Sequence, residues 1–202
     1  MDIKTTPNFL PEPVFYQLSR IIFAPTFKWF LMTSVVAPTS KQLLYSGSKE
    51  NSKLFYMSHL VYDKENYFNL ESTDSNILNF LVSEHLYLRD LSNYYDIIGE
   101  PMPEGQFLGI SSIENLLRIK INFFPHTPEL QEHAYHIDYD YSHKGSLLSL
   151  NTCDGYTKIL ETGTKYPSVA NTLLTFDTSK DHCSTTTTNA LGRFNIVINY
   201  VE

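Results

Sequence analysis

The most concentrated group of chemically active side chains lies in residues 133–143, which read HAYHIDYDYSH. Imidazole nitrogens and carboxylate oxygens are both ligands of divalent metal ions. If the segment forms a strand, alternation puts His136 and Asp138 on one face and turns His133 to the other. The HxD pair predicts half of a metal site, although HxD alone is a common pattern. His143 is expected in the following loop, at the rim of the site.

His182, in the stretch DHCS at 181–184, is a candidate for the third metal ligand. Two histidines and one carboxylate can form a facial triad that leaves metal positions open, as in non-haem Fe(II) oxygenases. The open positions suit a bidentate 2-oxoacid and O2. Arg193 begins the last candidate strand, and an arginine can hold the distal carboxylate of such a cosubstrate through two parallel hydrogen bonds. The order HxD, distal His, then Arg is more specific than any of its parts.

Strands must position these residues, and apolar alternation predicts several of them. In 116–124 the pattern places Arg118, Lys120 and Asn122 on one face. The two cations are expected either at the mouth of the site, where they would attract an anionic substrate, or on a solvated strand face. In 193–202, Arg193 shares a face with Asn195 and Val197, while Phe194, Ile196, Ile198 and Tyr200 form an apolar stripe. Further strands are predicted at 27–36, 53–63, 134–139, 145–151, 156–162, 171–177 and 181–186.

Helices are predicted at 11–23, where proline stands near the start, and at 72–92, where apolar residues recur at helical spacing. Residues 99–106 read as a loop and 151–155 as a turn. We expect one domain over 1–202. Within it, residues 1–110 would supply N-terminal helices and supporting strands, and 115–202 a core of short, regularly spaced strands that suggests a barrel or sandwich.

Composition limits the classes of function. Hydrophobic residues make up 42% of the chain and aromatic residues 14%, which is enough for a core and favours β structure. The net charge of −7 argues against strong non-specific nucleic-acid binding. No window is apolar and long enough to span a membrane, and no secretory signal is visible. With only Cys153 and Cys183, the sequence predicts reduced thiols and a cytoplasmic protein, in the host cell if the source is viral. Cys183 is expected as a small buried residue facing away from the His182 side.

The stretch from residue 115 to 202 resembles the Fe(II)/2-oxoglutarate-dependent oxygenases, and among them the prolyl-4-hydroxylase-like oxygenases encoded by bacteriophages. The resemblance implies that His136, Asp138 and His182 are iron ligands and that Arg193 binds the 5-carboxylate of 2-oxoglutarate. It also implies cosubstrate contacts for three further residues, Asn122, Asn195 and Ser149. The sequence departs from the family pattern where polar groups are frequent, at Ser149, Phe124 and Val197.

The resemblance implies a mainly β fold with flanking helices (α+β) and a double-stranded β-helix, or jelly-roll, core. Fe(II), 2-oxoglutarate and O2 are the expected cofactor and cosubstrates. The expected reaction is hydroxylation of a C–H bond, with a peptidyl residue such as proline, a nucleobase and a small molecule all open as substrate. Two alternatives remain: a catalytically inactive jelly-roll binding or structural module, and a cupin-type metal protein. The cupin class usually needs an HxH pair, which this chain lacks. The oligomeric state stays open.

Overall fold

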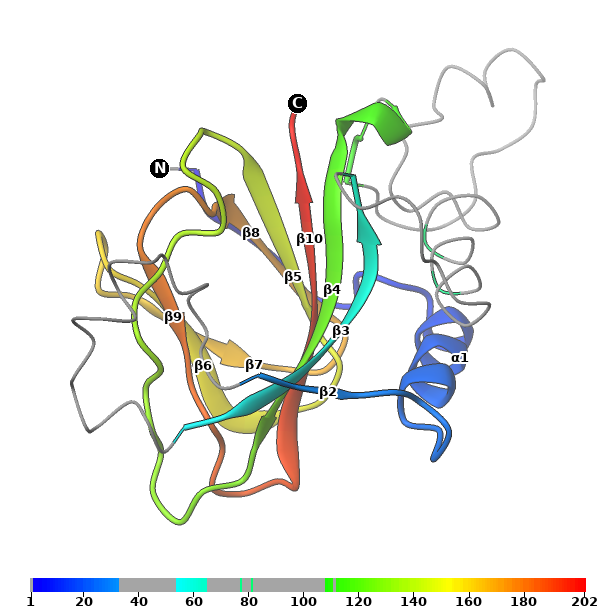
Figure 1. The fold of residues 1–202 in the computed structure, drawn as a ribbon, viewed down its shortest axis with the longest axis vertical. Helices are drawn as coiled ribbons and strands as arrows, with labels where there is room; N and C mark the ends of the chain where they lie inside the picture. The colour runs from blue at the N-terminus through cyan, green and yellow to red at the C-terminus, as the bar shows by residue number, and fades with distance from the viewer. Residues whose placement is uncertain (1, 33–53, 65–76, 78–80, 82–107, 111) are drawn as a thin grey trace.

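Two antiparallel sheets face each other in the computed structural model of the chain, which describes residues 2–32, 54–64, 77, 81, 108–110 and 112–202 (Figure 1). The large sheet has the strand order β1-β8-β5-β10-β4-β3-β2, and the small sheet has the order β7-β6-β9. This is a mainly β structure with a jelly-roll core, as the sequence predicts. The elements are β1 Lys4–Thr6, α1 Glu12–Ile22, β2 Phe30–Met32, β3 Tyr56–Asp63, the 3-10 helix Ile113–Asn115, β4 Leu116–Pro125, β5 Lys144–Ser149, β6 Cys153–Ile159, β7 Lys165–Ser168, β8 Thr172–Asp177, β9 His182–Ser184 and β10 Gly192–Tyr200.

The outer face of the large sheet is apolar and packs against α1. Alternation on β4 and β10 sends every second side chain to this face, where Leu18 and Ile22 of the helix are buried. Proline near the helix start and Arg20 in its last turn fit the local preferences of a helix. The partners from the sheet include Ile119, Ile121, Ile196 and Ile198. This layer makes the large sheet a rigid support for what lies on its other face.

The inner face of the large sheet carries polar side chains from β4 and β10. In the register of the two strands, Asn122 lies opposite Asn195 and Arg118 lies opposite Asn199. A smaller apolar cluster, made of Leu147, Ile159, Leu174 and Phe176, fills the space between the sheets farther along. The small sheet, with β6 and β9, faces the large sheet from the other side of the interior (Figure 1), and Arg193 of the inner face donates to Thr157 of β6.

The predicted strand 134–139 does not form. The segment makes only isolated bridges, between His136 and His182 and between Glu132 and Thr185. β7 was not predicted because Pro167 interrupts it, and a proline is tolerated there since β7 lies at the edge of its sheet. β1 was not predicted either, because three residues are too few to show a pattern.

Most of the other predicted strands on described residues form close to their expected bounds, but of the predicted strand 27–36 only Phe30–Met32 (β2) is a strand among the described residues. β9 is shorter than predicted and ends at Ser184, and β6 begins at Cys153, inside the predicted turn 151–155. Of the predicted helix 72–92 only Ile77 and Leu81 are described, both buried in the outer apolar layer. The predicted loop 99–106 and residues 33–36 of the predicted strand 27–36 lie outside the described residues. None of the described helices is long and apolar enough to cross a membrane.

Candidate functional site

Backbone hydrogen bonds hold the HxD segment beside β9. His136 and His182 exchange both N–H to C=O bonds, each 3.0 Å long, so the two residues lie directly opposite each other. Asp138 N donates to Thr178 O at 3.0 Å, and His133 N donates to Ser184 O at 2.9 Å. The segment is thus fixed at successive points although it is not a regular strand.

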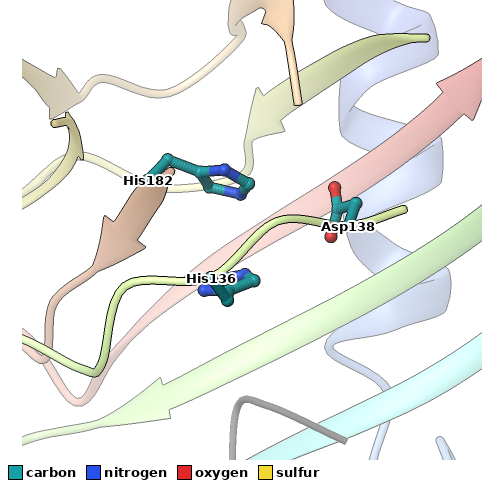
Figure 2. Close-up of side chains that lie close together, drawn as sticks. All are labelled: His136, Asp138 and His182. Carbon is teal, nitrogen blue, oxygen red and sulfur yellow. The ribbon is translucent and has the colours of Figure 1, made fainter. Parts of the chain in front are cut away.

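This arrangement brings the three predicted metal ligands together (Figure 2). One ligand atom of each of His136, Asp138 and His182 lies within 4.8 Å of the other two. The two imidazole rings are 4.4 Å apart between centroids, and the Phe176 ring contacts His182 edge-on at 5.1 Å. Ligand atoms this close can bind a single metal ion.

Both imidazoles have a fixed tautomer. His182 Nδ1 lies 2.9 Å from Lys180 O, and His136 Nδ1 lies 3.3 Å from Ala134 O. A carbonyl oxygen can only accept, so Nδ1 carries the hydrogen and Nε2 keeps its lone pair for a metal. Burial, with His182 nearby, lowers the pKa of His136 to about 4, which keeps that imidazole neutral at neutral pH.

Two donors hold the Asp138 carboxylate. Arg118 Nη2 donates to Oδ1 and Asn199 Nδ2 donates to Oδ2, each at 2.9 Å, and Arg118 Nε donates to Asn199 Oδ1 at 3.1 Å. Burial acts to raise the pKa of Asp138, but Arg118, the two histidines and the Asn199 amide outweigh it and lower the pKa to about 2. The carboxylate is therefore ionised and fixed in orientation.

A second layer of hydrogen bonds fixes Asn199. Its Nδ2 also donates to Thr178 Oγ1 at 3.2 Å, and the Thr178 hydroxyl lies 2.7 Å from His143 Nε2. Since His143 Nδ1 donates to Tyr141 O at 2.9 Å, its Nε2 accepts from Thr178. His143 was predicted at the rim of the site; it does lie in the loop before β5, but it is buried. Its buried position arises from the turn after the HxD segment, which the sequence pattern does not show.

Arg193 lies at the other end of the inner face of β10, and only 1% of its surface is exposed. Its Nη2 donates to Thr157 Oγ1 of the small sheet at 2.7 Å, while Nε and Nη1 are buried with no hydrogen-bond partner among the described residues. Burial lowers its pKa to about 10, so the guanidinium stays charged at neutral pH. Gly155 lies so close that a Cβ there would be 2.8 Å from Arg193 Cδ.

The other predicted cosubstrate residues lie near Arg193. Asn122 Nδ2 donates to Asn195 Oδ1 at 3.2 Å, and Asn195 Nδ2 and Asn122 Oδ1 are buried with no hydrogen-bond partner in the described parts of the chain. Ser149 lies opposite Asn195 in the register of β5 and β10. A cavity of about 110 Å³ is lined by Arg193, Ser149 and Thr157 together with apolar residues of β5 and β8.

The two cations of β4 are not on a solvated face. Arg118 is paired with Asp138 as described, and Lys120 Nζ donates to the Tyr56 hydroxyl at 2.9 Å. Phe124, where a polar residue is frequent in the family, stacks on Tyr56 at 5.5 Å and lies 5.7 Å from the Arg193 guanidinium. Of the two sequence interpretations, the one that puts these cations beside the site agrees with their positions.

His133, predicted to face away from the metal ligands, is not among the three converging side chains and is buried. Its ring contacts Phe124 at 5.1 Å in the interior. Burial, with Arg193 and His136 nearby, lowers its pKa to about 4. Cys183 is fully buried and lies opposite Lys158 in the register, on the other face from His182, as predicted.

Sequence reasoning missed Asn199, Thr157 and Thr178. Asn199 has the parity of Arg193, Asn195 and Val197 on β10, so continuing the alternation two residues further would have found it. Nothing in the local sequence marks Thr157 or Thr178, whose roles depend on contacts between distant segments.

No protein-family model matches the sequence, and no curated protein matches it. Its fold is similar to that of a 2OG-Fe(II) oxygenase family oxidoreductase from Burkholderia pseudomallei, with a TM-score of 0.63 and 13% identity over 98% of this chain and 84% of that one. It is also similar to SnoN, a non-heme alpha-ketoglutarate-dependent epimerase from nogalamycin biosynthesis (TM-score 0.56, 10% identity, 99% of this chain and 77% of that one). A prolyl hydroxylase from Trichoplax adhaerens, solved with a hypoxia inducible factor peptide, gives a TM-score of 0.51 at 14% identity, over 98% of this chain and 83% of that one. At these identities the likeness shows the fold, and one fold can carry different reactions.

Proposed function

We propose that this protein is an Fe(II)- and 2-oxoglutarate-dependent dioxygenase that hydroxylates a C–H bond of its substrate. The observation that carries the proposal is the pairing of two features between the sheets. One is the set of three converging ligands His136, Asp138 and His182. The other is a buried arginine, Arg193, that keeps unused donors. The fold shared with 2OG-Fe(II) oxygenases agrees with both.

The donor set fits the expected cofactor and cosubstrate. Two imidazoles and one carboxylate are the ligand set of the facial triad, which binds Fe(II) and leaves positions open. No carboxylate of the described residues forms an ion pair with Arg193, although an unpaired buried charge is costly. A carboxylate of 2-oxoglutarate would supply the acceptors that Arg193 Nε and Nη1 and Asn195 Nδ2 lack.

Each residue then has a definite task. Fe(II), if held by His136, Asp138 and His182, would supply the activation of O2 for the oxidative decarboxylation of 2-oxoglutarate to succinate and CO2, coupled to hydroxylation of the substrate. His136 and His182 present Nε2 because their Nδ1 hydrogens are engaged. Arg118 and Asn199 fix the Asp138 carboxylate. Arg193, held by Thr157, binds and orients the distal carboxylate, and the apolar cluster around Phe176 excludes water.

A second candidate function, an inert binding module of the same fold, is favoured by one observation. Asp138 is already engaged by Arg118 and Asn199, which satisfies its charge without any metal. Under this alternative the triad would be a structural cluster, and removing metal would change nothing.

Anaerobic loading with Fe(II) and 2-oxoglutarate, followed by O2 and measurement of succinate, separates the two candidates. We expect slow succinate formation by the wild type, even without substrate. His182→Ala should abolish it, and Arg193→Ala should reduce it sharply at sub-saturating 2-oxoglutarate. The exposed His126 and Arg20 provide matched controls, and His126→Ala and Arg20→Ala should act as the wild type. If the wild type binds neither Fe(II) nor 2-oxoglutarate, the inert module is the correct description.

Substrate identity, cytoplasmic location and the division into residues 1–110 and 115–202 remain predictions from the sequence.

A further inference from the structure

Lys120 is a cation without a counter-ion inside the site. Its Nζ donates to the Tyr56 hydroxyl at 2.9 Å and lies 5.0 Å from the centre of the Tyr56 ring. Within the described part of the chain, no carboxylate lies within ion-pairing distance of Nζ. Burial, with Arg118 nearby, lowers its pKa to about 8. The side chain thus remains largely charged at neutral pH while half-buried.

This charge does not serve the fold. Removing a cation from water without pairing it costs free energy, and an apolar side chain of the same length would avoid that cost. Arg118, two residues away on the same face, differs because Asp138 pairs with it. Asp138 is close enough to act on the Lys120 charge but forms its ion pair with Arg118, so Lys120 is best explained by a partner that none of the described residues supplies.

The position of Lys120 separates it from the Arg193 cavity. The lining of that cavity comes from Arg193, from β5, β6, β7 and β8, and from Thr5, with no contribution from β4. Lys120 lies on β4, with Val197 beside it on β10 and Leu60 beside it on β3. Leu60 is 43% exposed, so this side of the site is open to solvent. Lys120 is also close enough to His136 to contribute to lowering the pKa of that ligand. Lys120 therefore lies beside the exposed Leu60 and within electrostatic range of the metal ligand His136.

The charge balance points the same way. With a divalent metal and 2-oxoglutarate bound, the negative groups of the site would be Asp138 and the two carboxylates of the cosubstrate. The positive groups would be the metal, Arg193, Arg118 and Lys120. The positive charges exceed the negative ones, although the net charge of the protein is −7. In a partly desolvated site such an excess attracts anions strongly.

We propose that Lys120, held in place by Tyr56, binds an anionic group of the substrate, a carboxylate or a phosphate, and so selects acidic substrates. This inference rests on the proposed oxygenase function, because the bound anion belongs to a substrate only if the protein is an enzyme. The anion site itself is a property of the chain and can be tested without turnover.

The test is a calorimetric titration of protein saturated with Mn(II) and 2-oxoglutarate. The bound 2-oxoglutarate prevents Arg193 from binding the probe anions. Acetate probes the carboxylate source, inorganic phosphate probes the phosphate source, and acetamide is the neutral match for acetate. We expect one of the two anions to bind the wild type about tenfold more tightly than Lys120→Met, because a charge-assisted hydrogen bond is lost. Lys120→Arg should retain most of the affinity, and acetamide should not bind.

Lys165→Met is the matched control, since Lys165 also lies over a tyrosine ring, 4.4 Å from the centre of Tyr156, but is exposed on β7. It should bind both probes as the wild type does. Lys120→Met should fold with an unchanged or higher unfolding midpoint, because a buried charge is removed. Equal anion affinity in the wild type and Lys120→Met would overturn the inference. So would a loss of 2-oxoglutarate affinity in Lys120→Met, which would make Lys120 a cosubstrate residue.

Failure of the proposed function gives a different result. In that case Mn(II) and 2-oxoglutarate do not bind the wild type in the first step of the experiment. The same anion titrations on the metal-free protein, with Arg193→Met as background, then still decide whether Lys120 is an anion site.

Discussion

Replacing Asn199 with alanine is expected to weaken metal binding while leaving the fold intact. Asn199 Nδ2 donates to Asp138 Oδ2 at 2.9 Å, and its Oδ1 accepts from Arg118 Nε at 3.1 Å. The alanine variant keeps Asp138 and its ion pair with Arg118, but the carboxylate loses one of its two fixed contacts. It can then rotate away from the position in which it faces His136 and His182.

The magnitude follows from the contacts that are lost. A hydrogen bond to a charged group contributes roughly 1.5–3 kcal/mol, and loss of a group that orients a metal ligand typically costs 10- to 100-fold in affinity. Because Arg118 still holds Oδ1, the lower end applies, about tenfold or ~1.4 kcal/mol.

Calorimetry with Mn(II) in the absence of O2 measures the effect directly. Asn171→Gly is a suitable control because Asn171 also makes two side-chain hydrogen bonds, to Leu10 N and O, but lies away from the triad. Glycine tolerates the positive φ of 57° at that position. The control should lower the unfolding midpoint without changing Mn(II) affinity. If Asn199→Ala binds Mn(II) as tightly as the wild type while Asp138→Ala does not bind it, Asn199 does not position the ligand.

Two further predictions concern Arg193 and His133. In Gly155→Ala the new Cβ would lie 2.7 Å from Thr186 O and 2.8 Å from Arg193 Cδ, so Arg193 must move. Isothermal titration should show about tenfold weaker binding of 2-oxoglutarate and little change in Mn(II) affinity. An equal loss of affinity for both would contradict this reasoning. Burial lowers the pKa of His133 from 6.5 to about 4, so between these values the folded protein binds fewer protons than the unfolded chain. The free energy of unfolding of the metal-free protein should therefore fall as pH falls from about 6.5 to about 4. His133→Leu should make this fall shallower in urea titrations. His136, whose pKa is also about 4, and toward pH 4 the carboxylates of lowered pKa such as Asp138 contribute the rest of the slope. An unchanged slope would show that His133 is not buried as a neutral ring.

The candidate site could be predicted from the sequence to the extent that it depends on alternation within single strands. β10 shows this best, since the parity of Arg193 and Asn195 on one face and Ile196 and Ile198 on the other holds in the structure. The structure brings His136 and Asp138 together with His182 and leaves His133 out of this group, although the segment forms isolated bridges rather than a strand. The role of these side chains as metal ligands stays a prediction.

What the sequence could not provide is the pairing of groups on different elements. Arg118 lies on a strand and Asp138 in a loop, and the alternation of side chains within one element says nothing about contacts between two elements. The fold brings Arg118 Nη2 to 2.9 Å from Asp138 Oδ1. Thr157 reaches Arg193 from the small sheet, across the interior of the fold. β7 was missed because Pro167 looks like a strand breaker, whereas an edge position leaves its missing N–H without consequence.

The most direct test of the oxygenase assignment follows the oxygen atoms. Protein loaded anaerobically with Fe(II) and 2-oxoglutarate is exposed to ¹⁸O2, and the succinate is analysed by mass spectrometry. The proposed reaction requires that succinate carry one oxygen atom from O2 and that its formation be lost in His182→Ala. Absence of succinate from a wild type that binds both Fe(II) and 2-oxoglutarate, or succinate without the label, would contradict the assignment.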